Sequence, residues 1–249
     1  MLLEMSILST ELQKNTQVNV ILPEGGEPPR KILWLLHGLK GDHTSWLRNT
    51  SIERYAMKHH LAVVMPDAAR SWYTDTAYGA NYFSYIADEL PALCRRVFHG
   101  WSEAREDNIV AGLSMGGYGA LKLALSRPEQ YGSCIALSGA LDITRKGRPY
   151  MLDEWRSIFG YGLESALDLE GSQHDLFALA TKNRQEGLPF PKLYMWCGTE
   201  DTLITINRSF DQHLSNLGIK HTYEESEGVH KWVWWDLHIQ DGLKNILES

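Results

Sequence analysis

The stretch GLSMGGYG, residues 112–119, holds one serine, Ser114, among four glycines. The residues before it, NIVAGL (108–113), form an almost continuous apolar run, which is typical of a strand buried on both faces. The residues after it, 118–126, have the apolar spacing of a helix. Ser114 is therefore predicted at a turn from strand to helix, which is the setting in which a G-x-S-x-G motif forms a nucleophile elbow.

Such an elbow explains why glycines lie on either side of the serine. The turn is tight, so Gly112 and Gly116 avoid clashes that side chains would create beside the serine. The helix that begins after Ser114 directs its first backbone N–H groups toward the hydroxyl, which makes the N–H of Met115 a candidate oxyanion donor. A serine that only caps a helix is the alternative interpretation, and the strand and helix on either side favour the nucleophile.

A serine hydroxyl needs a general base, and the base needs an acid that orients it. In this strand–turn–helix arrangement the acid follows the serine and the histidine comes last. The predicted strand LYMWC (193–197) leads into Gly-Thr-Glu-Asp, so Asp201 is the preferred acid. Glu200 is the neighbouring alternative, and Asp142, after an earlier strand, is the second choice. Asp201 as a helix cap is the alternative without catalysis.

The base is expected after Asp201, in a loop at the same edge of the sheet. His230 lies in EGVHKW (227–232), between the last predicted strand (220–225) and the last predicted helix (233–247). That loop can carry an imidazole to Ser114. Three other histidines lie in helical or strand patterns and are interpreted as packing or surface residues: His213, His221 and His238.

The loop after KILWLL (31–36) is expected to supply the second oxyanion donor, through the backbone N–H of Leu39. His37, at the start of that loop, is interpreted as a brace that is hydrogen-bonded to backbone rather than as a second catalytic histidine. Three aromatic residues are candidates for the substrate pocket, with packing as the alternative role for each: Trp72, Tyr73 and Trp232.

Strand patterns alternate with helical patterns along the chain, which predicts βαβ units and a mostly parallel sheet in a single α/β domain, 1–249. The segment 141–191 is long for a connection between two strands and is expected to form a small cap insertion. The strands are expected at 17–22, 31–36, 61–65, 108–113, 134–137, 193–197 and 220–225, with a long helix over 81–98 that Pro91 interrupts.

The composition limits the classes of function. The chain has 249 residues, 43% hydrophobic and 22% charged, with a net charge of −7, which favours a folded domain and gives no basic field for nucleic acid. No apolar stretch approaches the about 20 residues of a membrane span, and the N-terminus is a poor signal peptide, so a cytoplasmic protein is expected. Neither a metal-ligand pattern nor a nucleotide-binding loop is recognisable, so no metal site and no nucleotide site are expected. The three cysteines are interpreted as buried free thiols: Cys94, Cys134 and Cys197.

With these motifs in place, the chain resembles the esterase D / S-formylglutathione hydrolase group of α/β hydrolases, and within it the small tributyrin-type esterases. The resemblance implies an α/β-hydrolase fold and a serine carboxylesterase that hydrolyses short-chain acyl esters of small molecules and needs no cofactor. It carries over Ser114, Asp201 and His230 as a catalytic triad, with Leu39 and Met115 as oxyanion donors. The shared stretches are LLHGLKGDHTSWLRNTSIERYA (35–56), VVMPDAARSWYTDTAYGANYFSYIADELP (63–91), GLSMGGYGALKLAL (112–125), WCGTEDTL (196–203) and GVHKWVWWD (228–236).

The sequence departs from the family pattern near the predicted site. The family often has His-Glu-Trp at the base loop, whereas this chain has His230-Lys231-Trp232. Lys40 stands where Ser or Thr often follows in the first loop, and a cation there could favour acidic substrates, although a solvated lysine is the simpler interpretation.

The same residues are compatible with other functions. A thioesterase acting on S-formylglutathione and an acyltransferase would use the same triad. A non-catalytic scaffold is disfavoured because such proteins usually lack a triad member. A homo-oligomer is also left open, and no nucleic-acid or membrane partner is expected.

Overall fold

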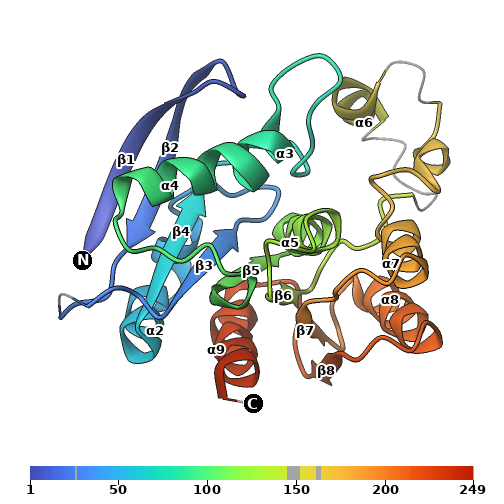
Figure 1. Cartoon of the computed structure of the whole chain (residues 1–249). Helices are drawn as coiled ribbons and strands as arrows, with labels where there is room; N and C mark the ends of the chain where they lie inside the picture. Colours follow the sequence, from blue (N-terminus) through green and yellow to red (C-terminus); the bar gives the residue numbers. More distant parts are fainter. Residues whose placement is uncertain (26, 145–151, 161–163, 249) are drawn as a thin grey trace.

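The structure is a computed structural model, which describes the chain except residues 26, 145–151, 161–163 and 249. Its described part is built on an eight-stranded sheet in the order β1-β2-β4-β3-β5-β6-β7-β8 (Figure 1). The pairs β1–β2 and β2–β4 are antiparallel, and all pairs from β4–β3 to β7–β8 are parallel, which confirms the predicted mostly parallel sheet. The strands are β1 (Leu2–Ser9), β2 (Lys14–Ile21), β3 (Lys31–Leu36), β4 (Leu61–Pro66), β5 (Asn108–Leu113), β6 (Ser133–Leu137), β7 (Lys192–Gly198) and β8 (Thr222–Ser226).

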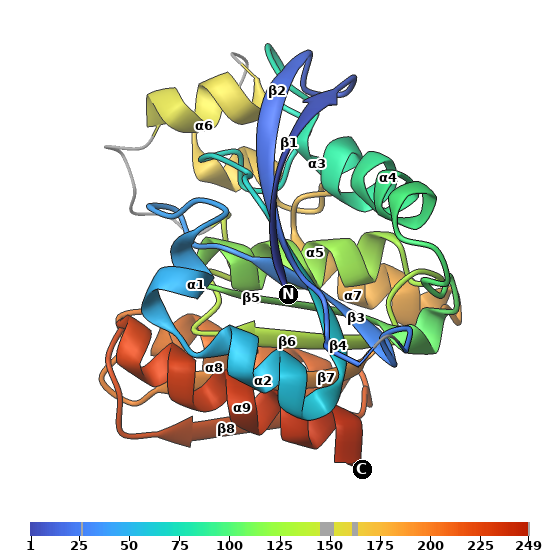
Figure 2. The same ribbon diagram turned by 90° about the vertical axis from the view of Figure 1, so that its left-hand side faces the viewer.

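Helices cover both faces of the sheet, with α2 and α9 on one face and α4, α5 and α7 on the other (Figure 2). Every residue of β4, β5 and β6 is buried, because these central strands pack against helices on both sides. The described helices are α1 (Ser45–Asn49), α2 (Ile52–His59), α3 (Tyr82–Ser84), α4 (Leu90–Val97), α5 (Met115–Ser126), α6 (Leu152–Phe159), α7 (Leu176–Gln185), α8 (Ile204–Asn216) and α9 (Trp232–Glu248).

The parallel register brings the carboxyl ends of four strands to one edge of the sheet. Leu36 of β3 pairs with Gly112 of β5, and Leu113 pairs with Leu137 of β6, which in turn pairs with Trp196 of β7. The loops that follow these strands therefore meet, although they come from distant parts of the sequence. This edge is the place where open α/β sheets usually bind ligands.

Two parts of the chain differ from the sequence prediction. The N-terminal strand β1 (Leu2–Ser9) was not predicted; its residues alternate between more and less exposed positions at the edge of the sheet. The predicted helix 81–98 is divided into α3, a π-helical turn at Tyr85–Glu89 and α4. The wider turn comes directly before Pro91, whose missing N–H and bulky ring do not fit a regular α-helix at that point.

The expected cap segment, 141–191, contains α6, a short 3-10 turn at Ala166–Leu169, and α7. Part of that segment, 145–151 and 161–163, lies outside the described residues. Its described portion is anchored on the core: Trp155 of α6 lies 4.8 Å from Trp72 between ring centroids, and the Tyr118 hydroxyl of α5 donates to the carbonyl of His174 at 2.9 Å.

Candidate active site

Ser114 sits between β5 and α5 in a backbone conformation that few residues other than glycine adopt. Its φ is 54° and its ψ is −116°. Such a conformation costs on the order of 1–3 kcal/mol and persists only where neighbouring contacts hold it. Here the Ser114 N–H donates to the carbonyl of Leu137 at 2.9 Å, and the Ser114 carbonyl accepts from Ala140 at 3.0 Å and from Tyr118 at 3.1 Å. The elbow is thus fixed by β6 on one side and by its own helix on the other.

The glycines of the motif allow this turn because backbone segments approach each other closely. A Cβ atom on Gly116 would lie 2.4 Å from the carbonyl oxygen of Leu36, and one on Gly112 would lie 2.3 Å from the carbonyl oxygen of Gly116. Both neighbouring atoms belong to the backbone and cannot move aside as a flexible side chain can. Any larger residue at Gly112 or Gly116 would therefore displace the elbow from its present position.

The structure brings Ser114, His230 and Asp201 into one hydrogen-bonded chain. The distance from His230 Nε2 to Ser114 Oγ is 3.0 Å, and His230 Nδ1 lies 2.9 Å from Asp201 Oδ2 and 3.1 Å from Oδ1. An ionised carboxylate only accepts, so Nδ1 carries the proton and Nε2 is left to accept from the serine hydroxyl. The Asp201 side chain is fully buried, whereas that of His230 is 32% exposed and can meet a ligand.

Asp201 stays ionised in spite of its burial. Burial by itself would raise the pKa of its carboxyl, but hydrogen bonds from His230 and from the Leu203 N–H, which lies 2.9 Å away, together with the charge of His230 lower the pKa below its ordinary value. The buried carboxylate can therefore stabilise an imidazolium at neutral pH.

The alternative acids occupy other positions. The Glu200 carboxylate accepts from the Gly228 N–H at 2.9 Å, and so ties the loop that carries His230 to the loop that carries Asp201. Asp142 accepts from the N–H and the hydroxyl of Thr144 at 3.0 and 2.8 Å. Neither carboxylate contacts His230.

The alternative histidines also have other partners. His213 lies 3.0 Å from the carbonyl of Phe177, His221 lies 2.8 Å from Asp211, and His238 lies 2.8 Å from Asp241. His238 is also stacked on Trp196, with 3.9 Å between the ring centroids. These contacts fit the packing and surface roles expected for the three.

Two residues that support the site were missed by the sequence analysis. The Trp235 ring meets the His230 ring edge-on, with 4.8 Å between centroids, and its Nε1 donates to Ser138 Oγ at 3.1 Å. Ser138 is fully buried, and its hydroxyl also helps to lower the pKa of the Asp201 carboxyl. It thereby connects Trp235, beside His230, with Asp201. The position of Ser138 directly after a predicted strand is the signal that could have suggested it.

The loop after β3 forms a tight turn in which the Gly41 N–H donates to the Gly38 carbonyl at 2.9 Å. His37 braces this turn: its Nδ1 donates to the Gly38 carbonyl at 2.8 Å, and its Nε2 accepts from the Ala68 N–H at 2.9 Å. The interpretation of His37 as a structural brace is confirmed. Within the described residues, the N–H groups of Leu39, in this turn, and of Met115, at the start of α5, have no hydrogen-bond acceptor.

A cleft of about 740 Å³ opens beside Ser114 and His230. Trp232 lines it, together with Leu39 and Val233, so one of the three aromatic pocket candidates lies where it was expected. Trp72 and Tyr73 do not line it, which corrects the prediction for those two: they are 1% and 0% exposed. The reason is that their segment packs under α5, where the Tyr73 hydroxyl donates to the His37 carbonyl at 2.8 Å.

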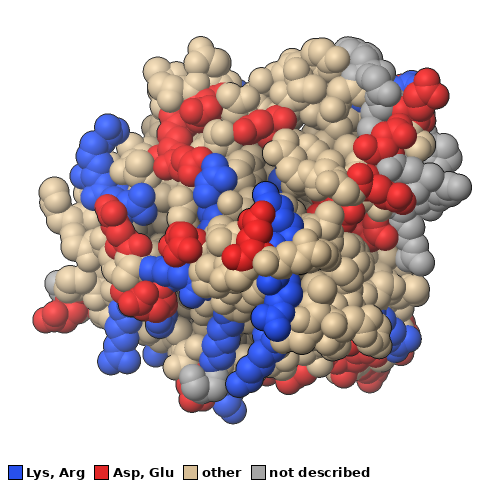
Figure 3. All heavy atoms as spheres, turned by 45° about the vertical axis from the view of Figure 1, so that its right-hand side comes forward, with Lys and Arg blue, Asp and Glu red and all other residues tan. Residues whose placement is uncertain are grey.

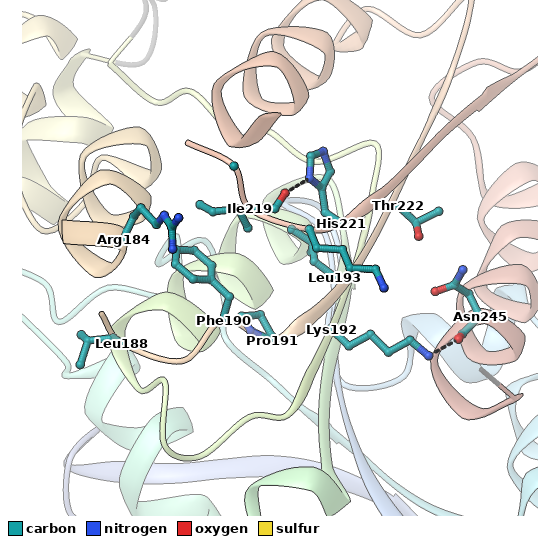
Figure 4. Close-up of a pocket in the computed structure, with 12 residues that line it drawn as sticks. Arg184, Leu188, Phe190, Pro191, Lys192, Leu193, Ile219, His221, Thr222 and Asn245 are labelled. Atoms are coloured by element: carbon teal, nitrogen blue, oxygen red, sulfur yellow. Dashed lines mark hydrogen bonds between the residues drawn. The ribbon is translucent and has the colours of Figure 1, made fainter. Parts of the chain in front are cut away.

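A second hollow of about 680 Å³ lies at the amino ends of β7 and β8, away from Ser114 (Figure 4). Its polar side chains are used in holding elements together. Lys192 donates to the carbonyl of Asn245 at 2.5 Å, Arg184 donates to that of Leu217 at 3.0 Å, and His221 lies between the Ile219 carbonyl and Asp211. This hollow is therefore a seam between α7, α9 and the sheet.

The three cysteines agree with the sequence analysis. Cys94, Cys134 and Cys197 are buried and free, as predicted, and burial raises the pKa of the Cys94 thiol to about 12. Among the residues that the structure describes, no three His, Cys, Asp or Glu side chains gather as a metal site, and no helix is long and apolar enough to cross a membrane. Acidic and basic side chains are interspersed on the face drawn in Figure 3.

A mostly parallel sheet with helices on both faces, and a strained serine at the turn from β5 to α5, define the α/β-hydrolase class. The sequence matches the family described as "Putative esterase" over residues 9–246, and the chain belongs to that family. An acetyl esterase of Caldicellulosiruptor saccharolyticus is 35% identical, over 98% of this chain and 97% of the relative.

Two solved structures from Staphylococcus aureus are similar over the whole fold. The fluorophosphonate-binding serine hydrolase FphF has a TM-score of 0.91 at 32% identity, covering 100% of this chain and 99% of that chain. The S-formylglutathione hydrolase FrmB has a TM-score of 0.85, also at 32% identity, covering 99% of this chain and 98% of that chain.

Proposed function

We propose that this carboxylic ester hydrolase cleaves short-chain acyl esters through a covalent acyl-enzyme on Ser114, with His230 as general base and Asp201 as the acid that orients it. The observation that carries the proposal is the 3.0 Å contact between Ser114 Oγ and His230 Nε2, at a serine whose backbone is held in a strained turn. Such a pair is the arrangement that activates a hydroxyl at neutral pH.

In the first step, Ser114 Oγ attacks the ester carbonyl carbon while His230 Nε2 takes the hydroxyl proton. Asp201 stabilises the imidazolium that forms. The tetrahedral intermediate then expels the alcohol, whose oxygen receives the proton from His230. In the second step, His230 takes a proton from water, the resulting hydroxide attacks the acyl carbon, and the acid leaves as the proton returns to Ser114.

The backbone N–H groups of Leu39 and Met115 are proposed to hold the negative oxygen of both intermediates. Both groups border the nucleophile, one from the turn after β3 and one from the first residue of α5, and neither has an acceptor in the described part of the chain. Each donor of this kind is worth about 3–4 kcal/mol of barrier. The histidine brace at His37 supports this role because it fixes the turn that presents Leu39.

The substrate class is proposed from the cleft and the relatives together. The cleft is partly apolar, with Leu39, Trp232 and Val233 in its wall, and a relative that is 35% identical is named an acetyl esterase. A thioester substrate is the second candidate, because FrmB, which is 32% identical, is named an S-formylglutathione hydrolase. A cytoplasmic location and a homo-oligomer stay predictions.

The test is to measure kcat/KM for the p-nitrophenyl esters of acetate, butyrate and octanoate, beside S-formylglutathione. We expect turnover of the two shorter esters and a loss of about 10³-fold or more in Ser114→Ala. If the wild type cleaves only the thioester, the ester proposal is wrong and thioester hydrolysis takes its place. Equal, slow rates for wild type and Ser114→Ala on all four compounds would overturn the proposed catalytic role of Ser114.

A further inference from the structure

The cleft beside Ser114 has a charge opposite to that of the molecule as a whole. The chain carries 31 acidic residues against 24 lysines and arginines. The residues that line the cleft nevertheless include three cations, Lys40, Arg48 and Lys231, and no acid. A positive cleft on a negative protein concentrates anions at that place.

Arg48 contributes little to this charge because it has a counterion. Its guanidinium lies 3.4 Å from Asp42 Oδ1. Burial would raise the pKa of the Asp42 carboxyl, but hydrogen bonds from Thr44 and Ser45 and the charge of Arg48 lower it to about 2. Asp42 is therefore ionised at neutral pH and offsets Arg48.

Lys40 and Lys231 have no such counterion. Both are exposed, and the ammonium group of neither forms a hydrogen bond or ion pair with any residue that the structure describes. Neither is needed to satisfy a buried group, so their charges are available to a ligand. Each ammonium is a compact charge on a flexible stem, which suits contact with anionic groups of varied position.

The two lysines are adjacent in sequence to the groups that act on the ester. Lys40 follows Leu39 in the tight turn closed by Gly38 and Gly41. Lys231 follows His230 directly and lines the same cleft. In the reaction proposed above, His230 passes its proton to the leaving oxygen, so the alcohol half of the ester lies on the side of His230 and Lys231.

We propose that Lys40 and Lys231 bind a carboxylate or phosphate carried by the alcohol half of the substrate. This inference rests on the proposed ester hydrolysis and names the substrate class within it: short acyl esters of anionic alcohols. An exposed charge pair at about 4 Å corresponds to roughly a fivefold effect on binding for each lysine. The effect is screened by salt, because both ammonium groups are in water.

The experiment compares two esters with the same acetyl group and similar shape, 3-acetoxybenzoate and 3-acetoxybenzamide. The enzymes are the wild type, Lys40→Met, Lys231→Met and the double variant, with Lys244→Met as the control. Lys244 is an exposed residue of α9 that does not line the cleft. The readout is the ratio of kcat/KM for the anionic ester to kcat/KM for the amide, at low and at high ionic strength.

We expect the wild type to prefer the anionic ester through a lower KM. The ratio should fall about fivefold in each single variant and further in the double variant, should fall with added salt, and should be the same in Lys244→Met and the wild type. Charge reversal in Lys231→Glu should turn the preference toward the amide.

A wild type that cleaves both esters with equal kcat/KM would overturn the inference and leave the proposed hydrolysis intact. So would a preference that survives in the double variant. The mono-p-nitrophenyl ester of succinate carries its anion on the acyl half, and p-nitrophenyl butyrate is its uncharged counterpart. The assignment to the alcohol half would be overturned if the lysines favour the succinate ester over the butyrate ester but do not favour 3-acetoxybenzoate over 3-acetoxybenzamide. Failure to cleave 3-acetoxybenzoate, 3-acetoxybenzamide and p-nitrophenyl acetate would overturn the proposed function, and the inference with it.

Discussion

Lys122 gives a quantitative prediction that is independent of catalysis, because it is a cation inside the fold. It lies on α5, is 3% exposed, and its ammonium donates to Thr74 Oγ1 at 2.6 Å and to His174 Nδ1 at 3.2 Å. It lies over the rings of Phe83 and Tyr118 at 5.5 and 5.6 Å from their centroids. Burial lowers its pKa from 10.5 to about 7, and the charge of Asp75 opposes this only in part.

The sign of the effect on stability follows from proton counting. Between pH 7 and pH 10.5, Lys122 is mostly neutral in the folded protein and protonated in the unfolded chain. The unfolded state binds more protons, so this group makes the free energy of unfolding rise with pH, by up to about 1.4 kcal/mol per pH unit. Burying the charge costs most below pH 7 and the cost disappears as the pH rises toward 10.5.

We therefore predict that Lys122→Met removes this dependence. The free energy of unfolding of the variant minus that of the wild type should be larger at pH 6.5 than at pH 9.5. This difference should change by roughly 3 kcal/mol over that range. The difference between the two proteins cancels the titration of the buried cysteines, which the variant leaves in place. The assay is urea unfolding at four pH values, with Lys244→Met as a surface control. Parallel curves for wild type and Lys122→Met between pH 6.5 and 9.5 would refute the reasoning.

Three further predictions concern the elbow and the groups behind His230. Gly116→Ala should lower kcat by at least about 10²-fold and reduce stability, because its Cβ would lie 2.4 Å from the Leu36 carbonyl; unchanged kinetics would show that the elbow can shift freely. Asp201→Asn should lower kcat by about 10⁴-fold with little change in the melting temperature, as expected where the imidazole is held in the wrong tautomer; a change below tenfold would assign the acid elsewhere. Ser138→Ala should lower kcat several-fold at constant KM, through the lost links to Trp235 and Asp201, and an effect on KM alone would contradict a positioning role.

Much of the fold was predictable because its strands are short apolar runs between helical patterns. The runs at residues 31–36 and 108–113 match β3 and β5 in full, since strands buried on both faces are apolar over nearly all of their length. The strand β1 was missed because it is an edge strand in which only Ser9 is buried, so it has no continuous apolar run to mark it. The π-helical turn before Pro91 was also not predicted, because a proline in a helical pattern indicates a disturbance but not its form.

The grouping of Ser114, Asp201 and His230 was predictable from chain order and from the loops that follow parallel strands. Contacts that depend on side-chain packing were not. Trp72 and Tyr73 come after a strand, as pocket residues often do, yet they lie in the core under α5. Their position depends on how that helix packs, which the sequence pattern does not indicate. Likewise, nothing in the run Trp232–Trp235 indicates that Trp235 is the tryptophan whose ring meets His230 edge-on.

The central claim, that Ser114 is the nucleophile, is tested most directly by covalent labelling. The protein and its Ser114→Ala and His230→Ala variants would be treated with a fluorophosphonate, followed by intact mass measurement and peptide mapping, with ester hydrolysis assayed in parallel. We predict one label per chain, on Ser114, with hydrolysis lost in proportion, no label in Ser114→Ala and slow labelling in His230→Ala. A label on another residue, or a Ser114→Ala variant that reacts and hydrolyses esters like the wild type, would contradict the account.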